Sequence, residues 1–422
     1  MSIWRIRGGA PLYGSVRVQG AKNSVLPIMA AAILAGCETE LLNCPDLSDV
    51  STTMEILRAL GCVAERDADI INIDSRGMTG CTVPGEMMRE MRSSVIFLGA
   101  ILSRCGEAVL SQPGGCELGP RPIDLHIEAI EALGAQVEER GGNLYCRAAG
   151  KLRGAHINFR FPSVGATENA MLAACSAEGE TVITNAAREP EIVDLQNFLL
   201  ALGAQVSGAG SPTITVSGFE PKQRVGYRIM PDRIVASTLL SAAAASGGKL
   251  ELRDAAPEHF ETVTEALGGM GCEIEAGKNA LTLKSNGRLH AGKPVITRPY
   301  PGFPTDAAPP LMAACLKAEG TTVFVENIFE NRYRHVEELK LLGADISTEQ
   351  RVAMVTGVRS LHGAEVTATD LRGGAALIVA GLSAEGETVI FDSGHIERGY
   401  ENLDTLLTEL GADIEKGVDI LR

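Results

Sequence analysis

The sequence predicts an α/β protein of two domains, each built from three copies of a repeat of about 70 residues. Two glycine-containing patterns recur six times along the 422 residues. Each copy pairs an almost wholly apolar stretch with an amphipathic one, both of helical length. Apolar residues make up 45% of the chain, so a core can form in each domain.

The first glycine pattern joins the end of a helix to a strand, as in ALGCVAE, ALGAQVEE and ELGADIEKG. Its glycines are Gly61, Gly134, Gly203, Gly271, Gly343 and Gly411. The second pattern, as in RCGEAVLS and AEGETVITN, has the same period. Its glycines are Gly36, Gly106, Gly179, Gly248, Gly320 and Gly386. We expect both series to lie where helices end, at positions that need a left-handed backbone.

The two helices of each copy differ in their expected burial. The first is apolar on all sides, as in PIMAAAILAG and ALIVAGLSAE, so it should be buried on all sides. The second, as in VSTTMEILRAL, has a polar face and should lie half exposed. Three copies around buried helices would make a closed domain of about 200 residues. We therefore expect two domains that meet near GYRIMPDR, with a ligand cleft between them.

Composition excludes several classes of function. The net charge of −15 argues against nucleic acid or an anionic membrane as a partner. The segment MSIWRIRGGAPLYG lacks the apolar core of a secretory signal, and the longest apolar run, VLPIMAAAILAGC, is too short to span a bilayer. The ten cysteines show no spacing typical of zinc, and no ATP or NAD motif occurs. We expect a cytoplasmic protein with reduced thiols and no metal.

Basic residues gather at one repeat position, the start of the buried helix. Counting 14 residues back from each glycine of the second series gives Lys22, Arg92, Gly165, Ile234, Asp306 and Arg372. Arg233 adjoins this set. Because helix N-termini suit phosphate and carboxylate, the sequence predicts anion sites there, with simple helix capping as the alternative. Asp306 is either a cap or a general base kept ionised by basic neighbours.

One loop is longer than its counterparts in the other copies. From Gly106 to Gly134 the second copy spans 28 residues, against 23 to 25 in the other five. The extra length holds PGGC, which ends at Cys116. A structural cysteine needs no such insertion, so we interpret Cys116 as a reactive group. A Cys–His nucleophile pair is less favoured, because His126 is expected on a helix ten residues further on.

Eight segments of the chain together carry a resemblance to a known family. They are GAKNSVLPIMAAAILA, PGGCELGPRPIDLH, PSVGATENAMLAA, NAAREPEIVDL, PDRI, FPTD, ENIFENRYRHVEEL and ATDLRGGAALIVAGL. In this order they resemble the UDP-N-acetylglucosamine 1-carboxyvinyltransferases, the enolpyruvyl transferases that catalyse the first step of peptidoglycan synthesis. The resemblance covers nearly the whole chain and implies a two-domain inside-out α/β barrel with three β-α-β-α-β-β units per domain. It implies a first domain of residues 22–230, carrying Cys116, and a second of residues 1–21 and 231–422, carrying Asp306.

The resemblance implies transfer of the enolpyruvyl group of phosphoenolpyruvate to the 3′-hydroxyl of UDP-N-acetylglucosamine, with release of phosphate and without metal or cofactor. It implies addition and then elimination through a tetrahedral ketal. The catalytic residues that it implies are Cys116, Asp306, Lys22 and Arg398. The substrate-binding residues that it implies are Lys22, Asn23, Arg92, Arg121, Pro122, Ile123, Asp124, Leu125, Ser163, Val164, Gly165, Asp306, Ile328, Asp370, Arg372 and Arg398.

Cys116 corresponds to the family's proton donor, which also forms an adduct with phosphoenolpyruvate. A free thiol is mostly protonated at neutral pH, so it can donate a proton. The resemblance further implies that the epoxide fosfomycin alkylates Cys116. Asp306 corresponds to the base at the sugar hydroxyl.

Two positions depart from the family pattern. Phe161 stands where some members have a lysine, and Arg160 is the nearest cation. After FPTD this chain has AAPP, and Pro309 and Pro310 fit only the first turn of a helix that starts at Asp306.

Two other functions would fit parts of this sequence. A 3-phosphoshikimate 1-carboxyvinyltransferase would share the fold and the reaction, but the Cys116 loop and RPIDLH favour the UDP-sugar. A non-catalytic scaffold with an anion-binding cleft would tolerate loss of Cys116, Asp306 or Lys22, and all three are present.

Overall fold

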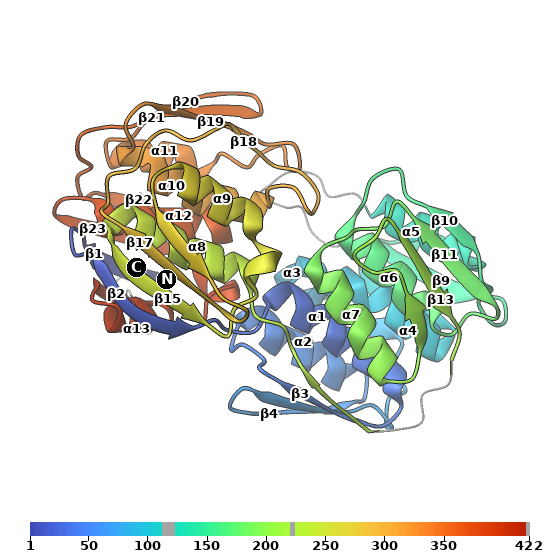
Figure 1. The fold of residues 1–422 in the computed structure, drawn as a ribbon. Coiled ribbons are helices and arrows are strands. Elements are labelled where there is room, and N and C mark those ends of the chain that lie inside the picture. The colour runs from blue at the N-terminus through green and yellow to red at the C-terminus, as the bar shows by residue number, and fades with distance from the viewer. Residues whose placement is uncertain (112–122, 220–223, 419–422) are drawn as a thin grey trace. The chain divides into compact units, whose positions relative to one another are not determined.

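Apolar helices form the centre of each of two units in the computed structural model, which describes residues 1–111, 123–219 and 224–418 (Figure 1). The first unit comprises the described residues 20–111, 123–219 and 224–230. The second unit comprises residues 1–19 and 231–418. The predicted site residues Cys116, Arg121 and Pro122 lie outside the described residues.

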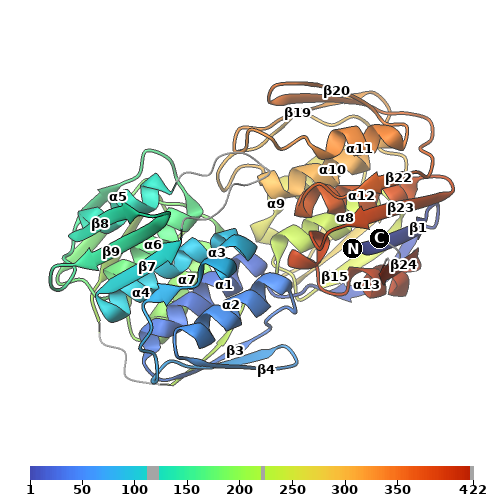
Figure 2. The same cartoon turned by 180° about the vertical axis from the view of Figure 1, so that it is seen from behind.

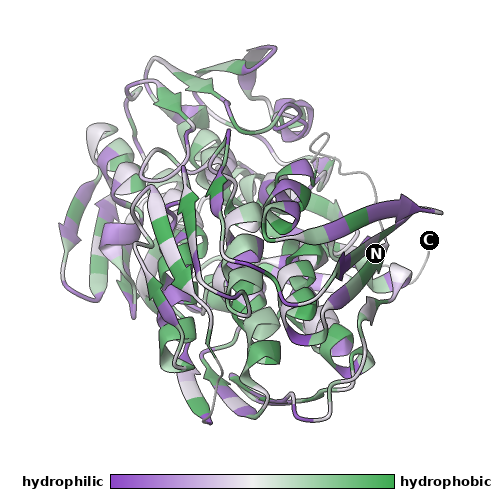
Figure 3. Cartoon of the chain, turned by 90° about the vertical axis from the view of Figure 1, so that its right-hand side faces the viewer, coloured by the Kyte–Doolittle hydropathy of each residue, from purple (hydrophilic) through white to green (hydrophobic). Residues whose placement is uncertain are grey.

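The internal helices carry almost no exposed residue, as their sequences predict. In the first unit they are α1 (Lys22–Ala31), α4 (Phe97–Cys105) and α6 (Val164–Ala174). In the second unit they are α8 (Arg233–Ser246), α10 (Ala308–Ala314) and α12 (Leu371–Ser383). They pack on one another within each unit, and the hydrophobic colour gathers on the interior helices in Figure 3.

A second set of helices lies half exposed, which confirms the amphipathic pattern. These helices are α2 (Ser48–Ala59), α5 (Asp124–Ala132), α7 (Pro190–Ala201), α9 (Glu261–Gly269), α11 (His335–Leu341) and α13 (Leu403–Glu409). The short helical segments are η1 (Ala32–Ala35), α3 (Gly85–Glu90), η2 (Arg92–Ile96), η3 (Pro257–His259), η4 (Thr305–Ala307), η5 (Cys315–Lys317) and η6 (Ile396–Arg398). The turn η4 ends before α10, so Pro309 and Pro310 lie in the first turn of α10, which begins at Ala308 rather than Asp306.

The sheets cover the internal helices, as Figure 2 shows for the first unit. The first unit's sheets have the orders β14(Val225–Arg228)-β3(Glu38–Leu42)-β5(Ile70–Asp74)-β4(Val63–Asp67), β6(Thr82–Val83)-β7(Glu107–Ser111)-β9(Asn143–Ala148)-β8(Ala135–Arg140) and β10(His156–Asn158)-β11(Glu180–Thr184)-β13(Thr213–Ser217)-β12(Gln205–Ser207). The second unit's sheets have the orders β2(Leu12–Arg17)-β15(Gly248–Arg253)-β17(Ala280–Ser285)-β16(Glu273–Ala276), β18(Val295–Ile296)-β19(Thr321–Val325)-β21(Val352–Thr356)-β20(Asp345–Glu349) and β22(Glu365–Thr367)-β23(Glu387–Asp392)-β1(Ser2–Arg7)-β24(Asp413–Val418).

Each sheet has the same pairing, which confirms the β-α-β-α-β-β repeat. The first two strands in each order run parallel, and the other pairs run antiparallel. Helices lie inside and sheets outside, and the described strands form separate four-stranded sheets rather than one closed barrel. Three strands are distant in sequence from the rest of their sheets: β14 completes the first repeat, β2 the fourth and β1 the sixth.

Every glycine of both series has a positive φ, as predicted. The first series directly follows the capping residues of the half-exposed helices, with φ from 91° to 104°. The prediction for the second series is partly wrong. Gly36 and Gly106 cap helices directly, and Gly248 follows the capping Gly247. Gly179, Gly320 and Gly386 lie a few residues beyond, because a short turn separates helix from strand.

The backbone at Gly203 can be tested separately from packing. A Cβ at Gly203 or at Gly150 would meet no atom within 4 Å, but only Gly203 has a left-handed φ, of +99°. Gly203→Ala should therefore lower the free energy of unfolding by about 1–2 kcal/mol, and Gly150→Ala should not. Thermal unfolding midpoints measure the difference. Equal midpoints in the two variants would contradict the role of the left-handed backbone.

Candidate active site

Predicted site residues mark the helix starts of the first unit. Lys22 is the first residue of α1, and Arg92 is the first of η2. Ser163 is the N-cap of α6, and its hydroxyl accepts from the N–H of Ala166 at 3.4 Å. Val164 and Gly165 follow it. Because η2 packs against both α1 and α6, these three elements lie next to one another.

The start of α1 presents a held cation beside an exposed amide. Nζ of Lys22 lies 2.7 Å from Oδ2 of Asp49 on α2, and their side chains are only 9% and 5% exposed. Separating a buried pair of this kind would leave an uncompensated buried charge, so Asp49 holds Lys22 in place. Asn23 is the exposed residue of α1.

The predicted residues Ile123, Asp124 and Leu125 form the start of α5. Asp124 pairs with Arg160, which also pairs with Glu128 one turn further along the same helix. Arg160, the cation nearest to Phe161, where the chain departs from the family pattern, is therefore held by two carboxylates.

His126 is a buried side chain on α5 that contacts α6 near its start. Its Nδ1 lies 2.7 Å from Nδ2 of Asn169, which also donates to the carbonyl of Val95 at 3.0 Å. A Cβ at Gly165 would come within 3.0 Å of Cε1 of His126, so glycine leaves room for the ring. Burial lowers the pKa of His126 to about 4, so the ring is neutral at pH 7.

Asp306 lies between two buried arginines in the second unit. Its Oδ1 accepts from Nη2 of Arg332 at 2.9 Å. Its Oδ2 accepts from Nε of Arg372 at 3.2 Å. The two arginine side chains are only 2% and 4% exposed, against 28% for Asp306. The cluster therefore carries a net positive charge with one partly accessible carboxylate.

The start of α12 fixes Arg372. Asp370 caps this helix, since its Oδ1 accepts from the backbone N–H groups of Arg372 and Gly373, each at 3.0 Å. The guanidinium of Arg372 lies 5.5 Å from the ring centre of Tyr400. Against the lowering effect of burial, Asp306 and Tyr400 raise the pKa of Arg372 above its usual value. Arg372 therefore remains a cation.

Two buried carboxylates hold in position the segments that carry the predicted residues Ile328 and Arg398. Glu326 accepts from the hydroxyl of Thr305 at 2.9 Å and from the N–H of Ile328 at 2.7 Å, which ties the Ile328 loop to η4. Asp392 accepts from the N–H of Ile396 at 3.1 Å and so anchors η6, which ends at Arg398. This turn packs against α12.

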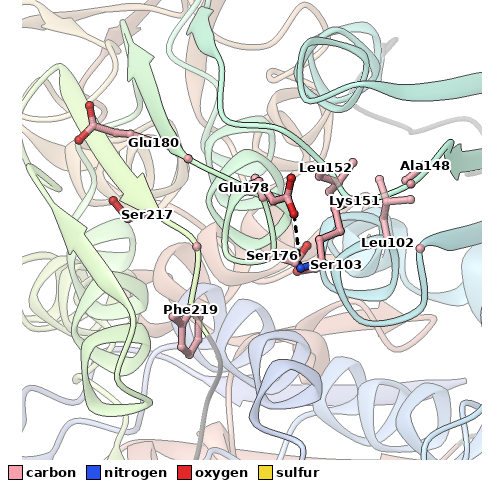
Figure 4. A pocket seen from close by; sticks show the side chains of 15 residues that line it. Leu102, Ser103, Ala148, Lys151, Leu152, Ser176, Glu178, Glu180, Ser217 and Phe219 are labelled. Atoms are coloured by element: carbon pink, nitrogen blue, oxygen red, sulfur yellow. Dashed lines mark ion pairs between the residues drawn. The ribbon is translucent and has the colours of Figure 1, made fainter.

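A cavity of about 940 Å³ in the first unit lies away from these helix starts (Figure 4). It is lined by the C-terminal end of α4 and the turn after α6, including Leu102, Ser176 and Phe219. Lys151 and Glu178 form an ion pair of 3.4 Å at its wall. Because α6 has 11 residues, its two ends lie roughly 16 Å apart. The residues that line this cavity include none of the predicted site residues.

The structure thus brings the predicted residues together in two groups. In the first unit they are Lys22, Asn23, Arg92, Ile123, Asp124, Leu125, Ser163, Val164 and Gly165. In the second unit they are Asp306, Ile328, Asp370, Arg372 and Arg398.

Sequence reasoning did not single out Asp49 and Arg332. Asp49 lies on the amphipathic helix α2, where a carboxylate is usually solvated. Arg332 lies in ENIFENRYRHVEEL, a quoted segment in which the repeat register marks no position.

Comparison with known proteins identifies the family. Residues 6–407 match the family model described as EPSP synthase (3-phosphoshikimate 1-carboxyvinyltransferase). UDP-N-acetylglucosamine 1-carboxyvinyltransferase 2 of Caldanaerobacter subterraneus is 47% identical over 98% of this chain and 99% of its own length. UDP-N-acetylglucosamine 1-carboxyvinyltransferase 1 of Symbiobacterium thermophilum is 48% identical over 97% of this chain and 94% of its own length. The chain belongs to the UDP-N-acetylglucosamine 1-carboxyvinyltransferase family.

Solved structures confirm the enolpyruvyl transferase fold. The enolpyruvyl transferase NikO of Streptomyces tendae matches with a TM-score of 0.87 at 27% identity, over 98% of both chains. EPSP synthase of Acinetobacter baumannii matches with a TM-score of 0.74 at 20% identity, over 99% of this chain and all of that one, and shows the fold alone.

Among the described residues of this family member, no cluster of three or more His, Cys, Asp and Glu side chains could hold a metal ion. In the same part of the chain, no helix is both long enough and apolar enough to cross a bilayer.

The buried His126 predicts a pH dependence of stability. The unfolded chain takes up a proton near pH 6.5, whereas the folded chain resists protonation until about pH 4. The free energy of unfolding should therefore fall, by up to about 3 kcal/mol from this residue, as the pH drops from 6.5 to 4. Unfolding midpoints of His126→Gln should depend less steeply on pH over this range. The exposed His156→Gln is the control, and an unchanged slope in His126→Gln would contradict the account.

The Asp306 cluster predicts a large stability effect. Asp306→Ala would leave two buried arginines without their counter-ion and should lower the free energy of unfolding by about 3 kcal/mol. Glu387 gives a matched control, because it also lies between two arginines, Arg5 and Arg7, but at the surface. Glu387→Ala should cost less than about 1 kcal/mol. Equal shifts of the unfolding midpoint in the two variants would contradict the importance of burial.

Proposed function

We propose that this protein transfers the enolpyruvyl group of phosphoenolpyruvate to the 3′-hydroxyl of UDP-N-acetylglucosamine and releases phosphate. The observation that carries the proposal is the 47–48% identity to enzymes of that name over nearly the whole chain. The reaction is the first committed step of peptidoglycan synthesis, on which cell-wall growth, cell shape and division depend. The described cysteines carry no disulfide, which fits a cytoplasmic location.

Phosphoenolpyruvate carries a phosphate and a carboxylate, and the proposed anion site binds both groups. Lys22, Arg121 and Arg398 hold these groups, with help from Asn23. Support comes from Lys22, which Asp49 holds at the N-terminal end of α1, where the helix dipole also favours negative charge. A fixed cation binds with less loss of side-chain entropy than a mobile one.

The UDP-sugar is bound by a second set of residues, which shares Arg121 with the proposed anion site. In the first unit these are Arg92, Arg121, Pro122, Ile123, Asp124, Leu125, Ser163, Val164 and Gly165. In the second unit Ile328 binds the UDP-sugar, Asp306 lies at its reacting hydroxyl, and Asp370 and Arg372 lie near the reacting centre. We further propose that the two units are the two domains, with boundaries near residues 21 and 230.

Asp306 is the proposed general base. Its two arginine partners favour the carboxylate form, so it is ready to accept a proton at neutral pH. The carboxylate is also the most accessible member of its cluster. It takes the proton of the sugar 3′-hydroxyl as the oxygen attacks C2 of phosphoenolpyruvate.

Cys116 is the proposed general acid. The thiol gives its proton to the methylene carbon of phosphoenolpyruvate, which produces the tetrahedral ketal. Loss of phosphate together with a proton from the new methyl group then forms the enolpyruvyl ether. The same thiol is the proposed site of alkylation by fosfomycin.

Phosphate release from phosphoenolpyruvate tests this proposal. Wild-type protein should release phosphate with UDP-N-acetylglucosamine and not with shikimate 3-phosphate. Cys116→Ala should lower kcat by at least about a hundredfold, because a positioned general acid typically contributes that much.

Three outcomes would contradict parts of this proposal. Release with shikimate 3-phosphate alone would overturn the acceptor and favour the 3-phosphoshikimate reaction. Full activity in Cys116→Ala would overturn the role of the thiol. No release with either acceptor, in folded protein, would favour a non-catalytic anion-binding scaffold.

A further inference from the structure

Asp194 is a buried carboxylate to which the proposed mechanism gives no role. It lies on α7 and is 7% exposed. Its Oδ2 accepts a hydrogen bond from the hydroxyl of Ser24 and a second, at 3.2 Å, from the N–H of Met230. Its Oδ1 accepts from the hydroxyl of Tyr227 at 2.6 Å. A buried carboxylate is costly unless it is hydrogen-bonded, and these three donors compensate that cost.

Ser24 connects this carboxylate to the start of α1. It is fully buried and lies two residues after Lys22 and one after Asn23. The helices α6, α8 and α12 begin with capping side chains, from Ser163, Asp232 and Asp370 respectively. The N-cap of α1 is Ala21, whose side chain cannot form such a bond. A carboxylate from a neighbouring helix therefore supplies the anchor that the cap does not.

Asp194 is itself held from the opposite side. Tyr227 lies on β14, and its ring packs edge-on against Phe198 with centroids 5.4 Å apart. Phe198 lies one turn after Asp194 on α7. The carbonyl of Met230 accepts from the N–H of Ala21 at 2.8 Å, so the same segment also contacts the residue before α1. The carboxylate thus joins α1, α7 and β14 at one point.

The charge of Asp194 suits this position. A carboxylate near the first turn of a helix interacts favourably with the positive end of its dipole. Hydrogen bonds to a charged acceptor are also stronger than those to a neutral one. The alternative is a purely structural role, in which the bond adds stability and leaves ligand affinity unchanged.

We propose that Asp194 is a positioning residue that acts through Ser24 to fix Lys22 and Asn23 for phosphoenolpyruvate. This inference rests on the proposed function, because it assigns Lys22 and Asn23 to that substrate. Without the bond, the first turn of α1 would still form but would be less well fixed beside Asp49. The affinity for phosphoenolpyruvate would then fall more than the affinity for the UDP-sugar.

The test compares Ser24→Ala, Asp194→Asn and the double variant with wild type. The control is Ser241→Ala, because Ser241 is equally buried on α8 and its hydroxyl bonds only to its own helix, at the carbonyl of Ser237. KM for each substrate and kcat are measured by phosphate release. Calorimetry measures the Kd of phosphoenolpyruvate.

Each single variant should raise KM and Kd for phosphoenolpyruvate about tenfold, the scale of one hydrogen bond to a charged group. KM for UDP-N-acetylglucosamine should change less than twofold. Because the two residues act as one unit, the double variant should be no worse than the worse single variant. Ser241→Ala should match wild type. If Asp194→Asn does not fold, Ser24→Ala carries the test.

Two results would overturn the inference. Phosphoenolpyruvate constants within twofold of wild type, in folded variants, would leave Asp194 a purely structural role. An equal rise of both KM values would indicate general loosening of the unit. Either result with active wild-type protein leaves the proposed function standing. If wild-type protein released no phosphate, the proposed function itself would fail, and this inference with it.

Discussion

The fold depends on the burial of helices that have no polar side. These helices are α1, α4 and α6 in the first unit and α8, α10 and α12 in the second. Within each unit they can avoid water only by packing on one another and beneath sheets. The hydrophobic effect therefore places helices inside and sheets outside. The same constraint requires a glycine turn at each return from helix to strand, since the chain must reverse sharply beside a packed core.

Burial also explains where the charged residues of the proposed site lie. A helix that is apolar along its length can carry charge only at its ends, and its N-terminal end already favours anions. In the described chain the cations Lys22, Arg92 and Arg372 mark such starts. Lys22 and Arg372, whose side chains are described, each need an anionic partner. Asp49 is the partner of Lys22, and Asp306 is the partner of Arg372. An acidic protein thereby carries positive charge at helix starts, where an anion is favoured.

The sequence predicts the repeats, the buried helices and the helix-start residues, because these follow from local pattern. It does not predict that β14, β2 and β1 complete distant repeats, since strand partners far apart in sequence leave no periodic signal. The resemblance alone indicated that the first residues join the second domain. Asp49, Asp194 and Arg332 were missed for another reason. On an amphipathic helix or in a loop, a charged side chain that is buried by a neighbour looks the same in sequence as one that is solvated.

The most direct test of the account is the structure of the product. The protein would be incubated with phosphoenolpyruvate and UDP-N-acetylglucosamine, and the sugar nucleotide would then be analysed by NMR and mass spectrometry. The account predicts an enolpyruvyl ether at the 3′-oxygen, with one phosphate released for each ether formed. Unmodified UDP-N-acetylglucosamine, or an enolpyruvyl group found only on added shikimate 3-phosphate, would contradict it.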